Sequence, residues 1–169
     1  MTVQENAIER HVVLIAPDVH WNTGNIGRTC IGVDACLHLI KPIGFSLESR
    51  EVKRAGLDYW HKVKLSVWED FDEFLSQMAP DPGEIALFSK NGNRSFRDMP
   101  QANRLFLVFG SETQGIPEPI MDQYKDAVYH IPINKEIRCL NLSTSVGIAL
   151  FESLRHMDPA HEWSHGHQP

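Results

Sequence analysis

Three stretches of this chain contain glycine or asparagine together with polar side chains that can bind a ligand. They are Asn22–Arg28 (NTGNIGR), Gly110–Gly115 (GSETQG) and Asn134–Asn141 (NKEIRCLN). Each lies close after an apolar run typical of a buried strand, and glycine allows a ligand to approach the backbone closely. In open parallel sheets such loops gather at the carboxyl edge of the sheet. The sequence therefore predicts one ligand site built from distant segments.

Arg28 is the cation of the first stretch. A helix is predicted from about Asn25, which would cap it, to Val33, so that Arg28 projects from its first turn. A cation is not favoured by the dipole at that end of a helix, which points to a functional role. A solvated surface arginine is the alternative.

The third stretch leads into a helix that begins near Leu142. Small residues alternate there with bulky ones at a spacing that favours a helix packed closely on both sides. Asn141 and Ser143 can cap its first turn, and its free amides would point back into the polar loop. An ordinary strand-to-helix connection is the alternative interpretation.

Strands and helices alternate along the whole chain. The predicted strands are His11–Ala16, Leu37–Ile40, Val63–Val67, Ile85–Phe88, Leu105–Phe109 and Ala127–Ile131. Besides the two helices above, the pattern predicts Phe71–Met78 with Asp70 as its cap, and a short helix from Pro117 to about Tyr124. This alternation is typical of a three-layer α/β fold with a largely parallel sheet. We expect one domain over residues 1–156 and a disordered tail over 157–169.

Composition narrows the function classes. The chain has 169 residues, a formal net charge of −6 and three cysteines, none in a CxxC spacing. The cysteine count and spacing argue against both a disulfide framework and a zinc site, so no metal is expected. With neither a membrane-length apolar run nor a signal peptide, a cytoplasmic protein is expected. An acidic chain is not drawn to polyanions as a whole, so any nucleic acid must meet a local basic face.

Basic residues do gather locally. Candidates for nucleic-acid contact are Arg50, Lys53, Arg54, Lys90 and Arg94. Tyr59 and Trp60 follow the first group, and aromatic surface beside positive charge suits stacking on an exposed base. Both aromatics can equally be core residues, and the loop from Ser89 to Asp98 can be a plain solvated loop.

Two common nucleotide motifs are absent from the Gly110–Gly115 loop. It lacks the Lys-Ser/Thr pair of a phosphate-binding P-loop and the glycine spacing of a dinucleotide fingerprint. A flavodoxin-like or phosphoacceptor module is a further alternative, although the strand ends lack the expected acidic cluster.

Taken together, three segments resemble the motifs of the SpoU branch of the SPOUT RNA 2′-O-ribose methyltransferases. They are NTGNIGR (Asn22–Arg28), LFLVFGSETQGIP (Leu105–Pro117) and IPINKEIRCLNLSTSVGIALFE (Ile131–Glu152), in family order and spacing. The stretch RAGLDYW (Arg54–Trp60) and the lack of an added RNA-binding domain resemble the subgroup that methylates the wobble-nucleotide ribose, C or U, of leucine tRNAs.

The resemblance implies a deep C-terminal trefoil knot, S-adenosylmethionine as cofactor, and a homodimer whose active site takes residues from both subunits. By position it assigns the cofactor pocket to Leu87, Gly110, Ile131, Cys139 and Leu140. It assigns the catalytic side to Asn22, Arg28, Glu112 and Asn141. Cys139 departs from the usual serine, and Thr144-Ser145 departs from the common Asn-Ala.

The implied reaction is in-line attack of a ribose 2′-oxygen on the sulfonium methyl group. A guanidinium with a pKa above about 12 is a poor general base. We therefore expect Arg28 to clamp the target phosphate while Glu112 fixes its fork. The basic residues named above would then engage phosphates of the anticodon loop. A different tRNA or rRNA target, or a non-catalytic relative that binds RNA or S-adenosylmethionine, are the alternatives.

Overall fold

The computed structural model describes residues 7–48 and 57–156, and all structural statements below concern these residues. Its strands are β1 (Glu9–Ile15), β2 (Cys36–Ile40), β3 (Lys64–Trp68), β4 (Ile85–Phe88), β5 (Arg94–Ser95), β6 (Arg104–Phe109) and β7 (Val128–His130). The α-helices are α1 (His20–Gly32), α3 (Phe71–Met78), α4 (Glu118–Gln123) and α5 (Leu142–Ser153). Short 3₁₀ turns are η1 (Leu57–Lys62), η2 (Pro82–Glu84), η3 (Phe96–Asp98) and η4 (Lys125–Ala127).

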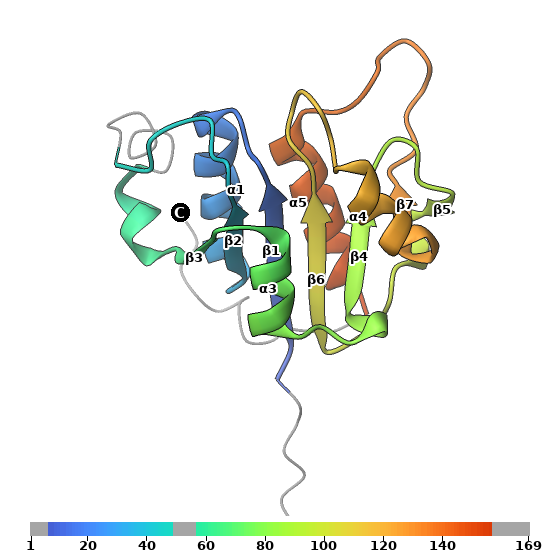
Figure 1. Ribbon diagram of the computed structural model, residues 1–169, viewed down its shortest axis with the longest axis horizontal. Coiled ribbons are helices and arrows are strands. Elements are labelled where there is room, and N and C mark those ends of the chain that lie inside the picture. Colours follow the sequence, from blue (N-terminus) through green and yellow to red (C-terminus); the bar gives the residue numbers. More distant parts are fainter. Residues whose placement is uncertain (1–6, 49–56, 157–169) are drawn as a thin grey trace, which may run out of the picture.

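All seven strands form one parallel sheet in the order β3-β2-β1-β6-β4-β7-β5 (Figure 1). Strand β6 lies between β1 and β4, so segments far apart in the sequence are neighbours at the centre. The predicted, largely parallel α/β sheet is confirmed. The prediction succeeded because continuous apolar runs favour strands that are covered on both faces.

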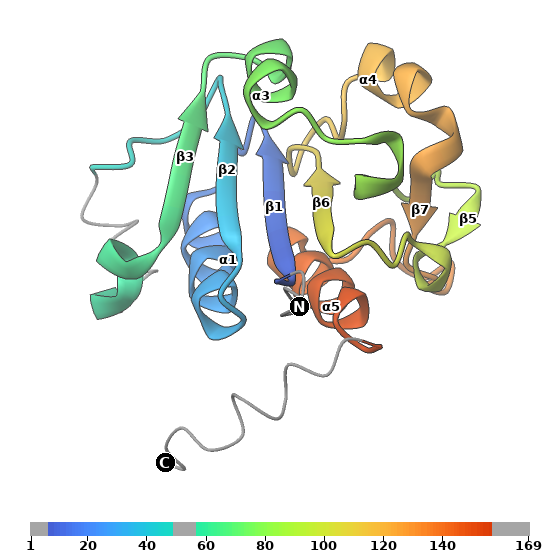
Figure 2. The same ribbon diagram turned by 90° about the horizontal axis from the view of Figure 1, so that it is seen from below.

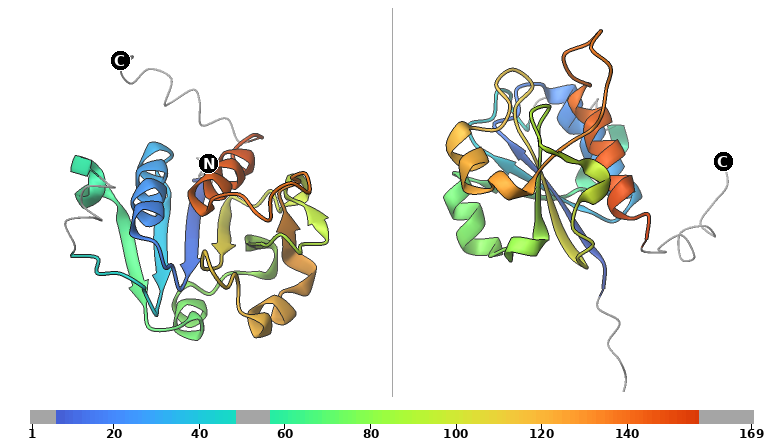
Figure 3. Two further views of the ribbon diagram at one scale, coloured as in Figure 1. Left: turned by 90° about the horizontal axis from the view of Figure 1, so that it is seen from above. Right: turned by 90° about the vertical axis from the view of Figure 1, so that its right-hand side faces the viewer.

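Helices cover both faces of the sheet, which gives three layers (Figures 2 and 3). Successive strand residues point to opposite faces. On β1, Val12 and Leu14 pack in the cluster that contains residues of α1 and α5. Val13 and Ile15 pack in the cluster that contains residues of α3 and residues on and around α4. The core is therefore split by the sheet into two halves.

Helix α5 is fixed at both ends. At its start the Asn141 side chain accepts from the amides of Ser143 and Thr144 at 2.9 and 3.4 Å. At its end the buried Arg10 donates from Nε to Ser153 Oγ at 3.0 Å and from a terminal nitrogen to Ser153 O at 2.9 Å. Burial lowers the pKa of Arg10 to about 10, so the guanidinium keeps its charge at neutral pH.

Two local expectations need correction. Helix α1 begins at His20 rather than near Asn25, and its N-cap, Val19, makes no side-chain capping bond. Asn22 therefore lies in the first turn, whereas Arg28 is far along the helix. The region after β4 is also not a plain loop, because Arg94–Ser95 pairs with β7 as an edge strand.

Trp60 is partly buried and packs against the core, not outward for base stacking. A Cβ added at Gly27 would meet its ring at 2.8 Å. The disordered tail expected over 157–169 lies outside the described residues, and so do Arg50, Lys53 and Arg54. Within the described ranges, no helix has the length and apolar character that crossing a bilayer requires.

Candidate active site

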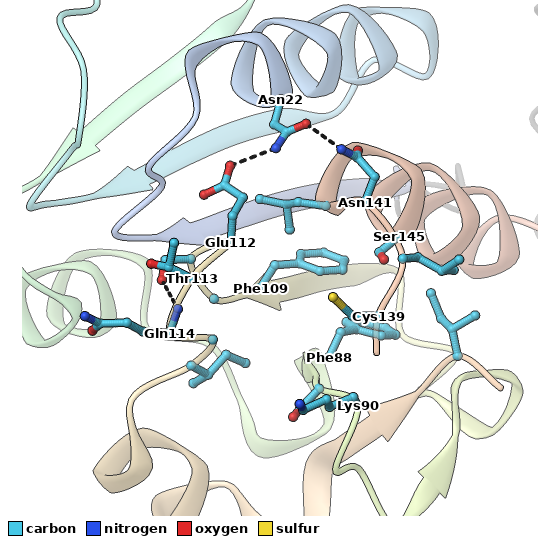
Figure 4. Close-up of a pocket in the computed structure, with 18 of the residues that line it drawn as sticks. Asn22, Phe88, Lys90, Phe109, Glu112, Thr113, Gln114, Cys139, Asn141 and Ser145 are labelled. Atoms are coloured by element: carbon cyan, nitrogen blue, oxygen red, sulfur yellow. Dashed lines mark hydrogen bonds between the residues drawn. The ribbon is translucent and has the colours of Figure 1, made fainter. Parts of the chain in front are cut away.

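A cavity of about 900 Å³ lies at the carboxyl edge of the sheet. Its walls come from the segments that follow β1, β4, β6 and β7 and from the first turns of α4 and α5 (Figure 4). This is the edge at which parallel α/β sheets bind ligands, and the volume is in the range of small-molecule sites. The convergence of the three predicted loops on one site is confirmed.

A chain of hydrogen bonds joins the three loops at one side of this cavity. Asn141 Nδ2 donates to Asn22 Oδ1 at 3.0 Å, and Asn22 Nδ2 donates to Glu112 Oε1 at 3.0 Å (Figure 4). The backbone amide of Asp18 donates to the other carboxylate oxygen, Glu112 Oε2, at 2.8 Å. Segments from both ends of the sequence are thereby held to the loop after β6.

The polarity of this chain is set by the start of α5. Because Asn141 Oδ1 accepts the free amides of the helix, its Nδ2 must donate outward, which turns Asn22 Oδ1 toward it. Asn22 then presents only donors to Glu112, and both oxygens of Glu112 accept a hydrogen bond. An ionised carboxylate is the form that accepts at both oxygens. The arrangement holds a negative charge at the polar wall of the cavity.

The loop after β6 is a tight turn that requires glycine at its start and favours glycine at its end. Gly115 has φ +72°, and a Cβ added at Gly110 would lie 1.9 Å from the carbonyl carbon of Gly115. Ser111 and Gly115 close the turn through an antiparallel bridge, with Gly115 N donating to Ser111 O at 3.0 Å. Backbone groups at Gly110 can therefore meet a ligand without interference from a side chain.

The opposite wall of the cavity is apolar. The rings of Phe88 and Phe109 stack at 4.9 Å and are almost fully buried. Ile131 and Leu140 complete the apolar surface, and Cys139 lies at its rim with Lys90 across from it (Figure 4). A flat apolar surface facing a fixed carboxylate suits a ligand that has a planar end and a charged end.

Most of the predicted site residues line this cavity. They are Asn22, Lys90, Gly110, Glu112, Ile131, Cys139, Leu140 and Asn141. Leu87 does not, because it faces the opposite side of the sheet and packs with the α3 and α4 cluster. The neighbouring Phe88 takes its place in the wall.

Two predicted cations also lie away from the cavity. Arg28 is exposed, and its Cζ is 5.7 Å from the centre of the Tyr59 ring. Arg94 donates to the carbonyl of Asp126 at 3.2 Å and lies 5.2 Å above the Tyr129 ring. The described part of a single chain therefore does not bring Arg28 to Glu112.

Sequence reasoning missed several residues of the site. Phe88 and Phe109 are the last residues of predicted strands, and strand alternation could have placed them at the edge. Asp18 contributes its backbone amide to Glu112, and because most residue types have such an amide, no signal in the sequence indicates it. Trp21, just before the first motif, lines the cavity with an indole that is 55% exposed.

Comparison with known proteins identifies the family of this chain. Residues 9–151, most of the chain, match the SpoU rRNA Methylase family. The chain belongs to this family. A Lactobacillus gasseri protein with the provisional name RNA (cytidine(34)-2′-O)-methyltransferase is 43% identical over 162 residues, which cover 94% of this chain and 87% of the relative.

Solved structures show the same architecture. One described as structural insights into the 2-OH methylation of C/U34 on tRNA has a TM-score of 0.79 and 36% identity, covering 87% of this chain and 95% of the other. The SpoU methyltransferase AviRb of Streptomyces viridochromogenes, in complex with the cofactor AdoMet, has a TM-score of 0.76. At 19% identity, over 90% of this chain and 58% of AviRb, it supports the fold alone.

Proposed function

We propose that this SpoU family member transfers a methyl group from S-adenosylmethionine to the ribose 2′-oxygen of the wobble nucleotide, C or U, of a tRNA. The observation that carries the proposal is the Asn141–Asn22–Glu112 chain beside a cavity with an apolar wall. The two relatives with 43% and 36% identity, named for methylation at position 34, supply the substrate. Leucine tRNAs remain the expected targets, in the cytoplasm.

The cavity fits S-adenosylmethionine. The stacked rings of Phe88 and Phe109 offer a planar apolar surface for adenine, and Gly110 and Gly115 add backbone groups to the cavity wall. Backbone groups near Ile131 and Leu140 would hold the adenosine by shape and hydrogen bonds. Bound there, the cofactor would supply an electrophilic methyl group on a sulfonium ion.

Asn22, Glu112 and Asn141 would position the target nucleotide. The hydrogen bonds at the start of α5 fix the amide orientations of Asn22 and Asn141. Both side chains would therefore keep these orientations when the ribose enters. Each Glu112 oxygen accepts one hydrogen bond from its own chain and keeps a lone pair for a further donor. That donor would be an arginine fork.

Arg28 would provide this fork from a second subunit. In its own chain it is exposed beside Tyr59 and away from the cavity, so a shared site explains its position. It would clamp the phosphate next to the target ribose and polarise the 2′-hydroxyl, with the phosphate or a nearby group accepting the proton.

A homodimer follows from this assignment. Helices α1 and α5 lie side by side on one face of the sheet, and α5 leaves Phe151 59% and Ile148 36% exposed. A second copy packed on these side chains would bury them and bring Arg28 toward the partner site. We also propose the C-terminal trefoil knot that the family resemblance implies, within the fold that the chain shares with the solved structures.

RNA contact would come from basic residues in the cavity wall and beyond it. Lys90 lines the cavity wall, and Arg94 lies on the neighbouring edge strand. Arg50, Lys53 and Arg54 are proposed for the same role from the segment outside the described residues. Because such contacts act through phosphate charge, affinity for tRNA should fall steeply as salt rises, and a flat salt titration would contradict this part.

The experiment that tests the function is methyl transfer to an unmodified leucine tRNA from methyl-labelled S-adenosylmethionine. We expect one methyl group per tRNA, recovered after nuclease digestion as a 2′-O-methylated wobble nucleoside. A matched tRNA with 2′-deoxycytidine at that position should accept none. Label recovered on a base, or no label despite cofactor binding, would refute the proposal.

A further inference from the structure

One aromatic side chain of the cavity wall, Trp21, takes no part in the proposed reaction. Trp21 immediately precedes Asn22 in the first turn of α1, and it lines the same cavity. Among the described residues, the exposed large aromatics are Trp21, Tyr59 and Phe151, at 55%, 42% and 59%. Of these, only Trp21 belongs to the cavity wall.

The indole of Trp21 is held by its neighbours on one side. The His20 ring meets it edge-on, with centroids 4.8 Å apart and an interplanar angle of 76°. His20 in turn meets Phe45 at 6.3 Å and 67°. Such edge-to-face pairs are favourable and fix the ring orientation, while 55% of Trp21 stays open to solvent.

Exposure distinguishes this surface from the apolar wall across the cavity. Phe88 and Phe109 are 8% and 2% exposed, which suits a small molecule enclosed by the protein. Trp21 has one side in the cavity and another in water, which suits a planar group carried into the site by a polymer. An unstacked RNA base is such a group, since proteins that bind single-stranded RNA stack its bases on aromatic rings.

We propose that Trp21 is the stacking platform for the base of the nucleotide whose ribose enters the site, with His20 and Phe45 as its support. This rests on the proposed function for the identity of the RNA. Stacking on Trp21 would place the base outside the cofactor pocket and its ribose beside Asn22 and Glu112. Stacking accepts any base, so this contact would capture the nucleotide rather than read its identity.

The test measures binding of two synthetic anticodon stem–loops by fluorescence anisotropy. They are identical except that one carries cytidine and the other an abasic ribose at the wobble position. Wild-type protein should bind the cytidine RNA about tenfold more tightly. Trp21→Ala should bind both RNAs equally, with the wild-type affinity for the abasic RNA, and Trp21→Phe should restore most of the preference.

A variant elsewhere serves as the matched control. Val67, on the edge strand β3, is an exposed apolar residue outside the cavity wall, and Val67→Ala should keep the full preference. A merely structural role of Trp21 would weaken binding of both RNAs alike and leave their ratio unchanged, which would overturn the proposal. It would also be overturned if Trp21→Ala lowered S-adenosylmethionine affinity or changed the oligomeric state.

Methyl transfer by the wild-type protein to the cytidine stem–loop separates the two proposals. Transfer without any preference over the abasic RNA in binding would refute the stacking platform alone. A clear base preference without methyl transfer would refute the proposed function while the platform on Trp21 stands.

Discussion

Asn22 and Glu112, ninety positions apart in the sequence, share a hydrogen bond of 3.0 Å at the polar wall of the cavity. Asn22 belongs to the first turn of α1 and Glu112 to the loop after β6. Their contact depends on β1 and β6 being neighbours in the sheet. The site therefore depends on the order of the strands in the sheet, which brings distant segments of the chain together.

Glu112→Gln should inactivate the protein without unfolding it. A glutamine places an NH₂ group against either the Asp18 amide or Asn22 Nδ2, both of which are donors. The resulting displacement should lower single-turnover methyl transfer by about 100-fold. S-adenosylmethionine affinity, measured by calorimetry, should stay within about threefold because the apolar wall is untouched.

Asp72→Asn is a matched carboxylate control for this variant, since Asp72 is exposed on α3, across the sheet from α1 and α5. It should transfer methyl groups at the wild-type rate. Full activity of Glu112→Gln would show that the carboxylate does not organise the site.

Arg28→Ala should bind S-adenosylmethionine normally and lose turnover. If Arg28 serves the partner's site, mixing it with an inactive Asn22→Ala variant should restore activity. Random exchange makes half of the dimers mixed, and one of the two sites in each is intact, so about a quarter of wild-type activity should return. Subunits would be exchanged by joint refolding and assayed by methyl transfer.

No recovery in this mixture, despite mixed dimers seen by mass spectrometry, would place Arg28 and Asn22 in a site of one chain. Each variant refolded alone gives the background rate. Loss of cofactor binding in Arg28→Ala would refute the assigned role of the arginine.

Acid should destabilise the protein through two buried histidines. Trp68 Nε1 donates to His38 Nδ1 at 3.0 Å, and the other His38 nitrogen lies 2.9 Å from His11 Nδ1. Burial lowers the pKa of His38 to about 3 and also lowers that of His11. Both rings are therefore neutral in the folded state, and His38 would donate to His11.

The sign of the effect follows from proton binding. Above about pH 6.5, His38 is neutral in both the folded and the unfolded protein. Below that pH the unfolded chain binds a proton at His38, whereas the folded protein does not do so until about pH 3, so stability falls as the pH falls. His38 alone should cost about 2 kcal/mol between pH 7 and 5. His38→Gln keeps both hydrogen bonds and cannot titrate, so urea unfolding should show a smaller loss. Equal losses in both proteins would contradict a neutral His38.

Arg10→Met should destabilise the protein by about 3 kcal/mol, because it leaves buried carbonyls and Ser153 Oγ without their charged donor. Ser153→Ala should cost less, about 2 kcal/mol, since it removes the bond from Arg10 Nε and the bond to Leu150 O but leaves the other Arg10 donors paired. The two effects should be non-additive because the residues are in contact. Urea unfolding at fixed protein concentration measures both.

Arg97→Met is the control for loss of an exposed arginine, and should change stability by less than about 0.5 kcal/mol. If Arg10→Met were equally mild, the attachment of α5 to the base of the sheet would contribute little.

Local signals explain which parts of the fold could be predicted. Asp70 caps α3 at the predicted position, because a cap and its amphipathic helix lie within a few residues of each other. The predicted start of α1 was wrong because the actual N-cap, Val19, has no capping side chain. Packing stabilises the first turn instead, since Asn22 and Thr23 are buried. The edge strand β5 was missed because its pairing with β7 is long-range.

The site could be predicted in composition but not in full geometry. Asn141 was expected both as a helix cap and in the site, and the structure shows that one side chain does both. Leu87 was expected in the wall, yet it faces the other half of the core while Phe88 lines the cavity. Arg28 was expected on the catalytic side, yet it lies far along α1 beside Tyr59, because the helix begins five residues earlier than predicted.

Because β6 lies between β1 and β4, the protein can assemble its site only late in its synthesis. A nascent chain on the ribosome can pair β1 with β2 early, but the centre of the sheet stays open until residue 109 has emerged. Asn141 arrives later still, with the helix that orients it. A truncated product therefore cannot assemble the asparagine pair, and premature release would yield an inert protein rather than one that modifies the wrong RNA.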